Sequence, residues 1–400
     1  MLQFPTNALP DHLEEFLRKL HGGPGEVLRM PVKLEHGGGL GAAVQAAQTI
    51  ATWSQLAGNG RPIALSQSFA QQLATRDRLA STLPGMAALY FATSITSGHA
   101  QLSRFEALEA VAPRVRAMQA CDFRNTLRGI GIALVCFAGA RSEFLNPLYS
   151  SPQPGAVRGH SDFRLLLQRM LSDLSSGLPA RLTNDQVELL SALVYQLFLN
   201  TDEHGSNEVS GRRYATGMRG ITARLTTLED IPSVVQYAGD DGPLRAYLSK
   251  VPLLKQHRSI AMGASATSAV KKAVASPIRL VELSVFDTGP GLALNWLAQS
   301  DGVTRYSDFD EERELEAIQR CFEKHASTKA TQFSGLGLTT ALRAMKMLNA
   351  FMTLRTGRMS LYQDFSTERV TSFEPRRRYP KKQRLPVIAG SGYTVLFRLP

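Results

Sequence analysis

The spacing of apolar and polar positions predicts helices alternating with strands along the whole chain. Leu13, Phe16, Leu17 and Leu20 recur at helical intervals, so residues 11–20 are expected to form a helix with one apolar side. Further helices are predicted at 42–56, 69–80, 105–117, 162–174, 183–205, 231–255 (an inserted pair), 315–322 and 339–348. Short β-branched and apolar runs predict strands at 26–34, 61–66, 128–139, 219–227, 281–287, 350–361 and 393–399.

This order predicts an α/β protein with two domains. Residues 1–150 are expected to form the smaller α/β domain, with a regulatory or partner-binding role and no catalytic constellation of its own. The stretch 150–159 (SSPQPGAVRG) is rich in Ser, Pro and Gly, so 151–180 is interpreted as a linker followed by a helix. Residues 181–400 are expected to form the second domain.

Composition narrows the class of protein. With 44% apolar and 20% charged residues, the 400-residue chain has the composition of a globular protein. Its longest apolar run, 129–140, is too short to span a bilayer, and the N-terminus lacks a signal-peptide pattern. The three cysteines have no C-x-x-C spacing. We therefore expect a cytoplasmic protein without a membrane partner.

The positive charge is concentrated in one segment. Residues 376–384 (RRRYPKKQR) contain six basic side chains, and without them the formal charge of +11 falls to +5. Such a cluster can bind phosphates, nucleic acid or an acidic partner. It can also be a solvated loop, which is the interpretation that the pattern favours.

Four sequence blocks carry candidate chemistry, and they follow one another in a set order. The central one is 281–292 (VELSVFDTGPGL), in which a strand ends on an aspartate followed by two glycines. It is preceded by 196–205 (QLFLNTDEHG) and followed by 322–338 (FEKHASTKATQFSGLGL) and 392–400 (GYTVLFRLP). In this order the blocks resemble the ATP-binding domain of the GHKL superfamily, which includes gyrase-type topoisomerases, mismatch-repair ATPases and sensor histidine kinases.

The resemblance covers roughly residues 180–400 and implies a fold, a cofactor and a site. The implied fold is a Bergerat-type α/β sandwich, a mixed sheet with helices on one face. The implied cofactors are ATP and Mg²⁺, with the metal bound by the amide oxygen of Asn200. The implied nucleotide contacts are Asp287, Gly289 and Gly291 at the adenine, Lys329 and the turn Gly335, Leu336, Gly337 and Leu338 at the phosphates, and Thr394 in the last strand.

The chain also departs from the family pattern. At the position where hydrolysing members usually carry a glutamate, this chain has Gln196, a neutral amide that cannot act as a general base. Glu203 is the alternative carboxylate on the same helix, so hydrolysis is expected to be weak or atypical. An insertion at about 206–275 and a basic hairpin at about 374–386 are further departures, and such insertions usually carry partner contacts.

Three functions remain open at this point. The favoured one is a nucleotide-dependent conformational switch, acting through an unidentified protein partner of the N-terminal domain or the insertion, or through a homodimer. The second is a protein kinase of the sensor or anti-sigma type, for which His160 is the candidate phosphoacceptor. Independently of the output, the layout of residues 1–150 resembles an anti-sigma-antagonist-like module, a common companion of such ATPases. The third is a nucleic-acid-acting ATPase, supported only by the basic segment.

Overall fold

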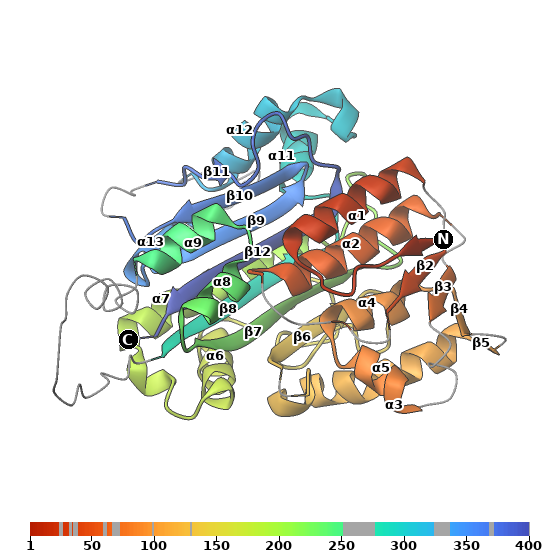
Figure 1. Ribbon diagram of the computed structural model, residues 1–400, viewed down its shortest axis with the longest axis horizontal. Helices are drawn as coiled ribbons and strands as arrows, with labels where there is room; N and C mark the ends of the chain where they lie inside the picture. Colours follow the sequence, from red (N-terminus) through yellow and green to blue (C-terminus); the bar gives the residue numbers. More distant parts are fainter. Residues whose placement is uncertain are drawn as a thin grey trace, which may run out of the picture.

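The computed structural model describes residues 1–23, 27–31, 34, 39–58, 62–65, 73–97, 100–128, 130–250, 277–323, 337–367 and 372–399. Two sheets organise this part of the chain (Figure 1). The smaller sheet contains β1 (Leu2–Gln3), β2 (Leu28–Met30), β3 (Pro62–Leu65), β4 (Ser94–Ser97) and β5 (Ala100–Leu102) in sequence order. Its neighbouring strands are parallel except for the pair β4–β5.

The larger sheet has seven strands in the order β11-β10-β9-β12-β8-β7-β6. The strands are β6 (Ile132–Phe137), β7 (Met218–Leu228), β8 (Ile278–Asp287), β9 (Phe351–Gly357), β10 (Met359–Asp364), β11 (Arg376–Arg377) and β12 (Ile388–Arg398). Every neighbouring pair is antiparallel. The predicted strand 350–361 is a hairpin, because Gly357, with φ of +51°, turns the chain between β9 and β10.

The helices form at positions close to those that the apolar spacing predicts. They are α1 (Pro10–Gly22), α2 (Ala42–Leu56), α3 (Leu73–Ala80), α4 (Leu83–Phe91), α5 (Arg104–Gln119), α6 (His160–Leu174), α7 (Asn184–His204), α8 (Ile231–Ala238), α9 (Gly242–Ser249), α11 (Leu292–Asp301), α12 (Glu311–Cys321) and α13 (Gly337–Met347). The sequence pattern missed α4 and α11. The residues of α4 are all buried, so this helix shows no amphipathic period.

Helices cover both faces of the larger sheet, and this corrects the expectation of a mixed sheet with helices on one face. Side chains on one face of β8 and β12, such as Leu280 and Leu396, pack with α8 and α9, and α2 lies on the same face. On the other face, Asp287 lies against the end of α7. All β12 residues except the last are buried, as expected for a strand covered on both sides.

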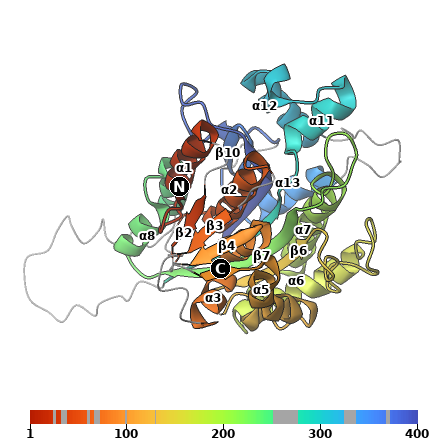
Figure 2. The ribbon, with the colours of Figure 1, turned by 90° about the vertical axis from the view of Figure 1, so that its right-hand side faces the viewer.

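The N-terminal and C-terminal regions share one hydrophobic core. The strand predicted at 128–139 was expected in the smaller domain, but as β6 it pairs with β7 at the edge of the larger sheet. One continuous core cluster runs from Phe4 to Leu399. The helix α2 is buried along nearly its whole length among α1, α4 and β12, and Figure 2 shows α1 and α2 close to the strands of the smaller sheet.

The predicted linker packs against the helix α7. Tyr149 and Val157 form an antiparallel bridge, and the backbone N–H of Gly155 donates to the Asp202 carboxylate at 3.1 Å. At the start of α7, Thr183 and Gln186 form the predicted capping box, with bonds of 3.1 and 2.9 Å. The helix that carries the candidate metal ligand is thus held at both ends.

Candidate functional site

The turn after β8 places Asp287 at the C-terminal end of a central strand. Only 5% of the residue is exposed. Its Oδ1 atom accepts a bond of 2.9 Å from the backbone N–H of Gly289. Burial raises the pKa of this carboxyl to about 7, although the backbone N–H groups of Gly289 and Ser391 oppose the shift. A carboxylate can accept about four hydrogen bonds, so Asp287 retains acceptor capacity for a ligand.

Glycines bring the end of α7 into direct contact with this turn. A Cβ atom on Gly205 would lie 2.3 Å from the Cβ of Asp287, and one on Gly289 would lie 2.6 Å from the carbonyl oxygen of Gly205. Gly291, at φ of +93°, would bring a Cβ within 2.5 Å of the Tyr306 hydroxyl. The sequence pattern assigned Gly289 and Gly291 to close approach of a purine, whereas here their immediate neighbours are protein atoms.

Hydrogen bonds from three other elements hold the turn. The Thr288 hydroxyl accepts from the N–H of Met218 in β7 at 2.8 Å, and the Pro290 carbonyl accepts from the Tyr306 hydroxyl at 2.8 Å. The N–H of Leu292 donates to Thr356 in β9 at 3.0 Å. The position of Asp287 is thus fixed by strands on both sides.

The helix α7 carries the candidate metal and catalytic residues close to this turn. Gln196 and Asn200 are half-buried and lie one turn apart on the same side of the helix. Within the described part of the chain, the Asn200 amide makes no hydrogen bond, which leaves its oxygen available to a cation. Five residues of helical rise, about 7.5 Å, separate Asn200 from Gly205, which touches Asp287. The fold thus places the end of the helix that carries the predicted metal ligand against the predicted adenine acceptor.

The two candidate catalytic residues differ in exposure. Glu203 is exposed, and its carboxylate lies 4.0 Å from the His204 ring. Gln196 is one turn further from the Asp287 contact than Asn200.

Among the described residues, no group of three or more His, Cys, Asp or Glu side chains could hold a metal ion. The expected Mg²⁺ stays a prediction, with Asn200 as its candidate ligand.

The sequence analysis missed a buried polar cluster beside the site, centred on Arg219. This residue is directly opposite Asp287 in the β7–β8 register. Its Nε donates to the Tyr149 hydroxyl at 2.8 Å, and its guanidinium also pairs with Asp202 (3.2 Å) and Glu143 (3.1 Å). Tyr149 donates in turn to Asp202 at 2.6 Å. The only signal in the sequence was an arginine inside an apolar strand.

Thr394 lies on the opposite face of the sheet from Asp287. Its hydroxyl is 2.8 Å from that of Ser284, and a Cβ on Gly41 would approach it to 2.9 Å. In the β8–β12 register Thr394 is directly opposite Ser284, and residues three apart on one strand point to opposite faces. Thr394 therefore does not lie beside Asp287, and its contact with the nucleotide stays a prediction.

The predicted lid lies mainly outside the described residues. This applies to Lys329, Gly335 and Leu336. Gly337 and Leu338 are the first residues of α13, which packs beside α7. The predicted start of a helix after the glycine-rich turn thus agrees with the backbone, and the phosphate contacts stay a prediction.

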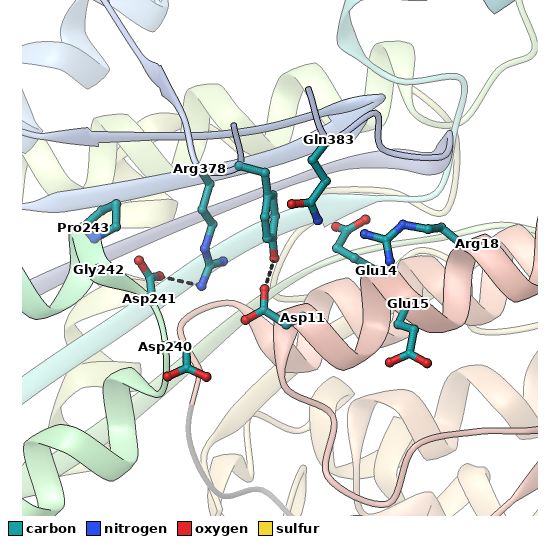
Figure 3. A pocket seen from close by; sticks show the side chains of 11 residues that line it. Asp11, Glu14, Glu15, Arg18, Asp240, Asp241, Gly242, Pro243, Arg378 and Gln383 are labelled. Carbon is teal, nitrogen blue, oxygen red and sulfur yellow. Dashed lines mark hydrogen bonds and ion pairs between the residues drawn. The ribbon is translucent and has the colours of Figure 1, made fainter. Parts of the chain in front are cut away.

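Three of the six basic side chains in the segment 376–384, those of Arg377, Arg378 and Lys381, pair with acidic neighbours. Arg377 pairs with Glu311 at 2.6 Å, and Arg378 pairs with Asp241 at 2.5 Å. Figure 3 shows Arg378 and Asp241 at one side of a polar cleft of about 520 Å³, whose lining comes from α1, α9 and the segment 378–383. Asp241 also caps α9. Half of the basic side chains of this segment are therefore engaged in ion pairs within the protein, while Arg376, Lys382 and Arg384 are exposed.

Comparisons with known proteins give no match: no protein-family model, no curated protein and no solved structure is similar to this chain. In the described part of the chain, none of the helices has both the length and the apolar composition needed to cross a bilayer.

Proposed function

We propose that the protein binds Mg²⁺-ATP beside the Asp287 turn and acts as a nucleotide-dependent conformational switch with weak or atypical hydrolysis. The observation that supports this most is the contact between Gly205 and Asp287. It joins the end of the helix carrying Asn200 to the buried carboxylate that would accept the adenine amine. In this proposal, the two residue types that an ATP site needs come from distant parts of the sequence, Asn200 from α7 and Asp287 from the end of β8.

Each residue would have a separate task. Above its pKa of about 7, the ionised Asp287 would accept a hydrogen bond from the exocyclic amine of adenine. Asn200 would bind Mg²⁺ through its amide oxygen, and the metal would neutralise phosphate charge. Lys329 and the turn 335–338 would bind phosphate oxygens through an ammonium group and backbone N–H groups at a helix N-terminus.

Burial of Asp287 favours a switch over a rigid pocket. Because 5% of the residue is exposed and Gly205 covers it, a purine can reach the carboxylate only if the end of α7 shifts. That end is tied through Asp202 to Tyr149 and Gly155 in the 149–157 segment. Nucleotide binding would therefore move groups outside the site, which is what a switch requires.

The observations give less support to catalysis of phosphate transfer. Gln196 is a neutral amide, which does not accept a proton at neutral pH, and Glu203 is exposed to solvent. Neither residue is therefore a buried general base. His160, the candidate phosphoacceptor for a kinase, begins α6 and lies 3.5 Å from Glu188. The nucleic-acid alternative is weakened by the ion pairs of Arg377 and Arg378.

The test is calorimetry with Mg²⁺-ATP on the wild type, Asp287→Asn and a matched control, Asp301→Asn. Asp301 is an exposed α11 residue paired with Arg313, so its substitution keeps the site intact. We expect binding by the wild type and the control, and at least tenfold weaker binding by Asp287→Asn, because a charged acceptor is lost. Phosphate release from the same samples should be slow.

The other outcomes separate the alternatives. Absence of binding by the wild type would refute an ATP site. Robust phosphate release would refute a switch with weak hydrolysis, and Glu203 would then be the candidate general base. Transfer of the γ-phosphate to a protein side chain would support the kinase.

A further inference from the structure

The side of α2 that faces the larger sheet is polar, although the helix is buried. Gln48 and Thr52 are 0% and 4% exposed. With Gln45 and Gln55, they are spaced by three, four and three residues, so all four lie on one side of the helix. Buried amides and hydroxyls cost free energy unless they find partners, so the contacts of this stripe indicate what it does.

The stripe bonds to an irregular part of β12. The register between β12 and β9 shifts between Ile388 and Ser391, which is a β-bulge. Within the bulge, the carbonyl of Ala389 accepts from Gln48 at 3.0 Å, and the N–H of Ala389 donates to the Thr52 hydroxyl at 2.8 Å. Both backbone groups of a residue outside the regular ladder are therefore satisfied by α2.

The next residue of the bulge bonds to the candidate nucleotide turn. The N–H of Gly390 donates to the carbonyl of Gly289 at 2.7 Å. Gly390 has φ of +73°, and a Cβ there would lie 2.0 Å from the Asp287 carbonyl oxygen, so no other residue fits without displacement. Gln55 also bonds directly to the turn, donating to the Thr288 carbonyl at 3.1 Å.

We infer that α2 positions the Asp287–Gly291 turn through the 389–390 bulge, so that Gln48, Thr52 and Gln55 are positioning residues of the site. None of them lies in the region of family resemblance. Coupling to nucleotide rests on the proposed function. If nucleotide binds beside Asp287, its binding is expected to change the contacts of α2. By reciprocity, any partner that displaces α2 changes the affinity for nucleotide.

Two substitutions on α2 give a matched test. Thr52→Val removes the acceptor of the Ala389 N–H and keeps the side-chain shape. Thr49→Val removes a buried hydroxyl that bonds only within the helix, to the Gln45 carbonyl at 2.7 Å. Hydrogen exchange, followed by mass spectrometry on peptides covering 286–292 and 387–392, is compared for both variants without nucleotide. Thermal unfolding checks that both variants fold.

We expect exchange in the two peptides to be about tenfold faster in Thr52→Val and close to wild type in Thr49→Val. Equal exchange in the two variants would overturn the positioning role. With Mg²⁺-ATP, we expect binding by Thr52→Val to be about fivefold weaker and exchange in wild-type α2 to slow. Unchanged affinity in Thr52→Val would overturn the coupling. If the wild type does not bind ATP, the proposed function fails, while the exchange comparison still decides the positioning role.

Discussion

Two buried arginines, Arg355 in β9 and Arg219 in β7, lie on opposite faces of the larger sheet and are satisfied to different degrees. Arg355 bonds through Nε and Nη2 to both oxygens of Glu14, at 2.6 and 3.0 Å. Its remaining donors bond to backbone carbonyls at 357, 359 and 386. Arg219 is 2% exposed, and its Nη2 has no hydrogen-bond partner in the described part of the protein.

The difference distinguishes a rigid cluster, that of Arg355, from a cluster that can rearrange, that of Arg219. The Arg355 cluster uses all five donors of the guanidinium and joins α1 to the β9–β10 hairpin, so any movement there breaks several bonds at once. In the Arg219 cluster, Nη2 has no hydrogen-bond partner among the described residues. This cluster also lies where the proposed switch requires α7 to move. A partly satisfied network costs less to rearrange than a saturated one.

The largest effect is expected for Arg355→Met. It leaves Glu14, which is 1% exposed, without its cation, and removal of one partner of a buried pair costs about 3–5 kcal/mol. Arg219→Met should cost less, about 1–3 kcal/mol, because Asp202 keeps the Tyr149 hydroxyl and Glu143 keeps Arg213 and the N–H of Gly139. Urea unfolding measures both, and an equal or reversed order would contradict the contrast between the clusters.

Asp287 is a third buried charged group to compare with the two arginines. Among the described residues, its hydrogen-bond donors are backbone N–H groups. With its pKa raised to about 7, the folded protein keeps a proton that the unfolded chain releases above its lower, ordinary pKa. The carboxyl therefore lowers stability progressively as the pH rises from about 4 to 7. Relative to the wild type, Asp287→Asn should gain about 2–3 kcal/mol of stability between pH 5 and pH 8.

Unfolding by urea across that pH range measures the difference. Asp301→Asn serves as the control, because Arg313 lowers the pKa of that exposed carboxyl, and its stability difference should stay nearly constant over this range. A difference for Asp287→Asn that does not change with pH would show that Asp287 is ionised throughout.

Tyr149→Phe tests the Arg219 cluster alone. It removes a hydroxyl that accepts from Arg219 and donates to Asp202, so we expect a loss of about 1–2 kcal/mol in unfolding free energy. Tyr362→Phe is the matched control, since the Tyr362 ring stacks on Phe351 and its hydroxyl makes no hydrogen bond in the described residues. A loss as small as that of the control would mean that the cluster contributes little to holding α7.

The smallest effect is expected for an exposed ion pair. Arg313 and Asp301 are 2.5 Å apart, but their side chains are 45% and 38% exposed. Solvent screening leaves such an exposed pair little net stabilisation, so Arg313→Ala should leave the urea midpoint nearly unchanged. A cost comparable to that of Arg219→Met would show that burial does not set the scale of these contacts.

Local elements were predictable because each depends on neighbours in the sequence. The helix 42–56 was predicted with the bounds of α2, and the capping box at Thr183 and Gln186 formed as expected. Asp287 was predicted at a strand end and is the last residue of β8. These features follow from side-chain period and capping, which act over a few residues.

Features set by pairing between distant segments were not predictable. The strand 132–137 has the same apolar composition whichever sheet it joins, and only its register with β7 places it in the larger one. The side of the sheet on which Thr394 lies depends on the register of β12. The neighbours of Arg219 come from two other parts of the chain, the connection that contains Glu143 and Tyr149 and the helix α7.

By itself, the sequence determined the positions of most helices and strands, the strand–turn block at Asp287 and the helix that carries Asn200, because local periodicity and capping chemistry encode them. Only the tertiary structure decided that the larger sheet is antiparallel and covered on both faces, that Gly205 closes over Asp287, and that α2 bonds to the β12 bulge. Those contacts depend on strand register and on close approach of backbones far apart in the chain, which no local pattern specifies.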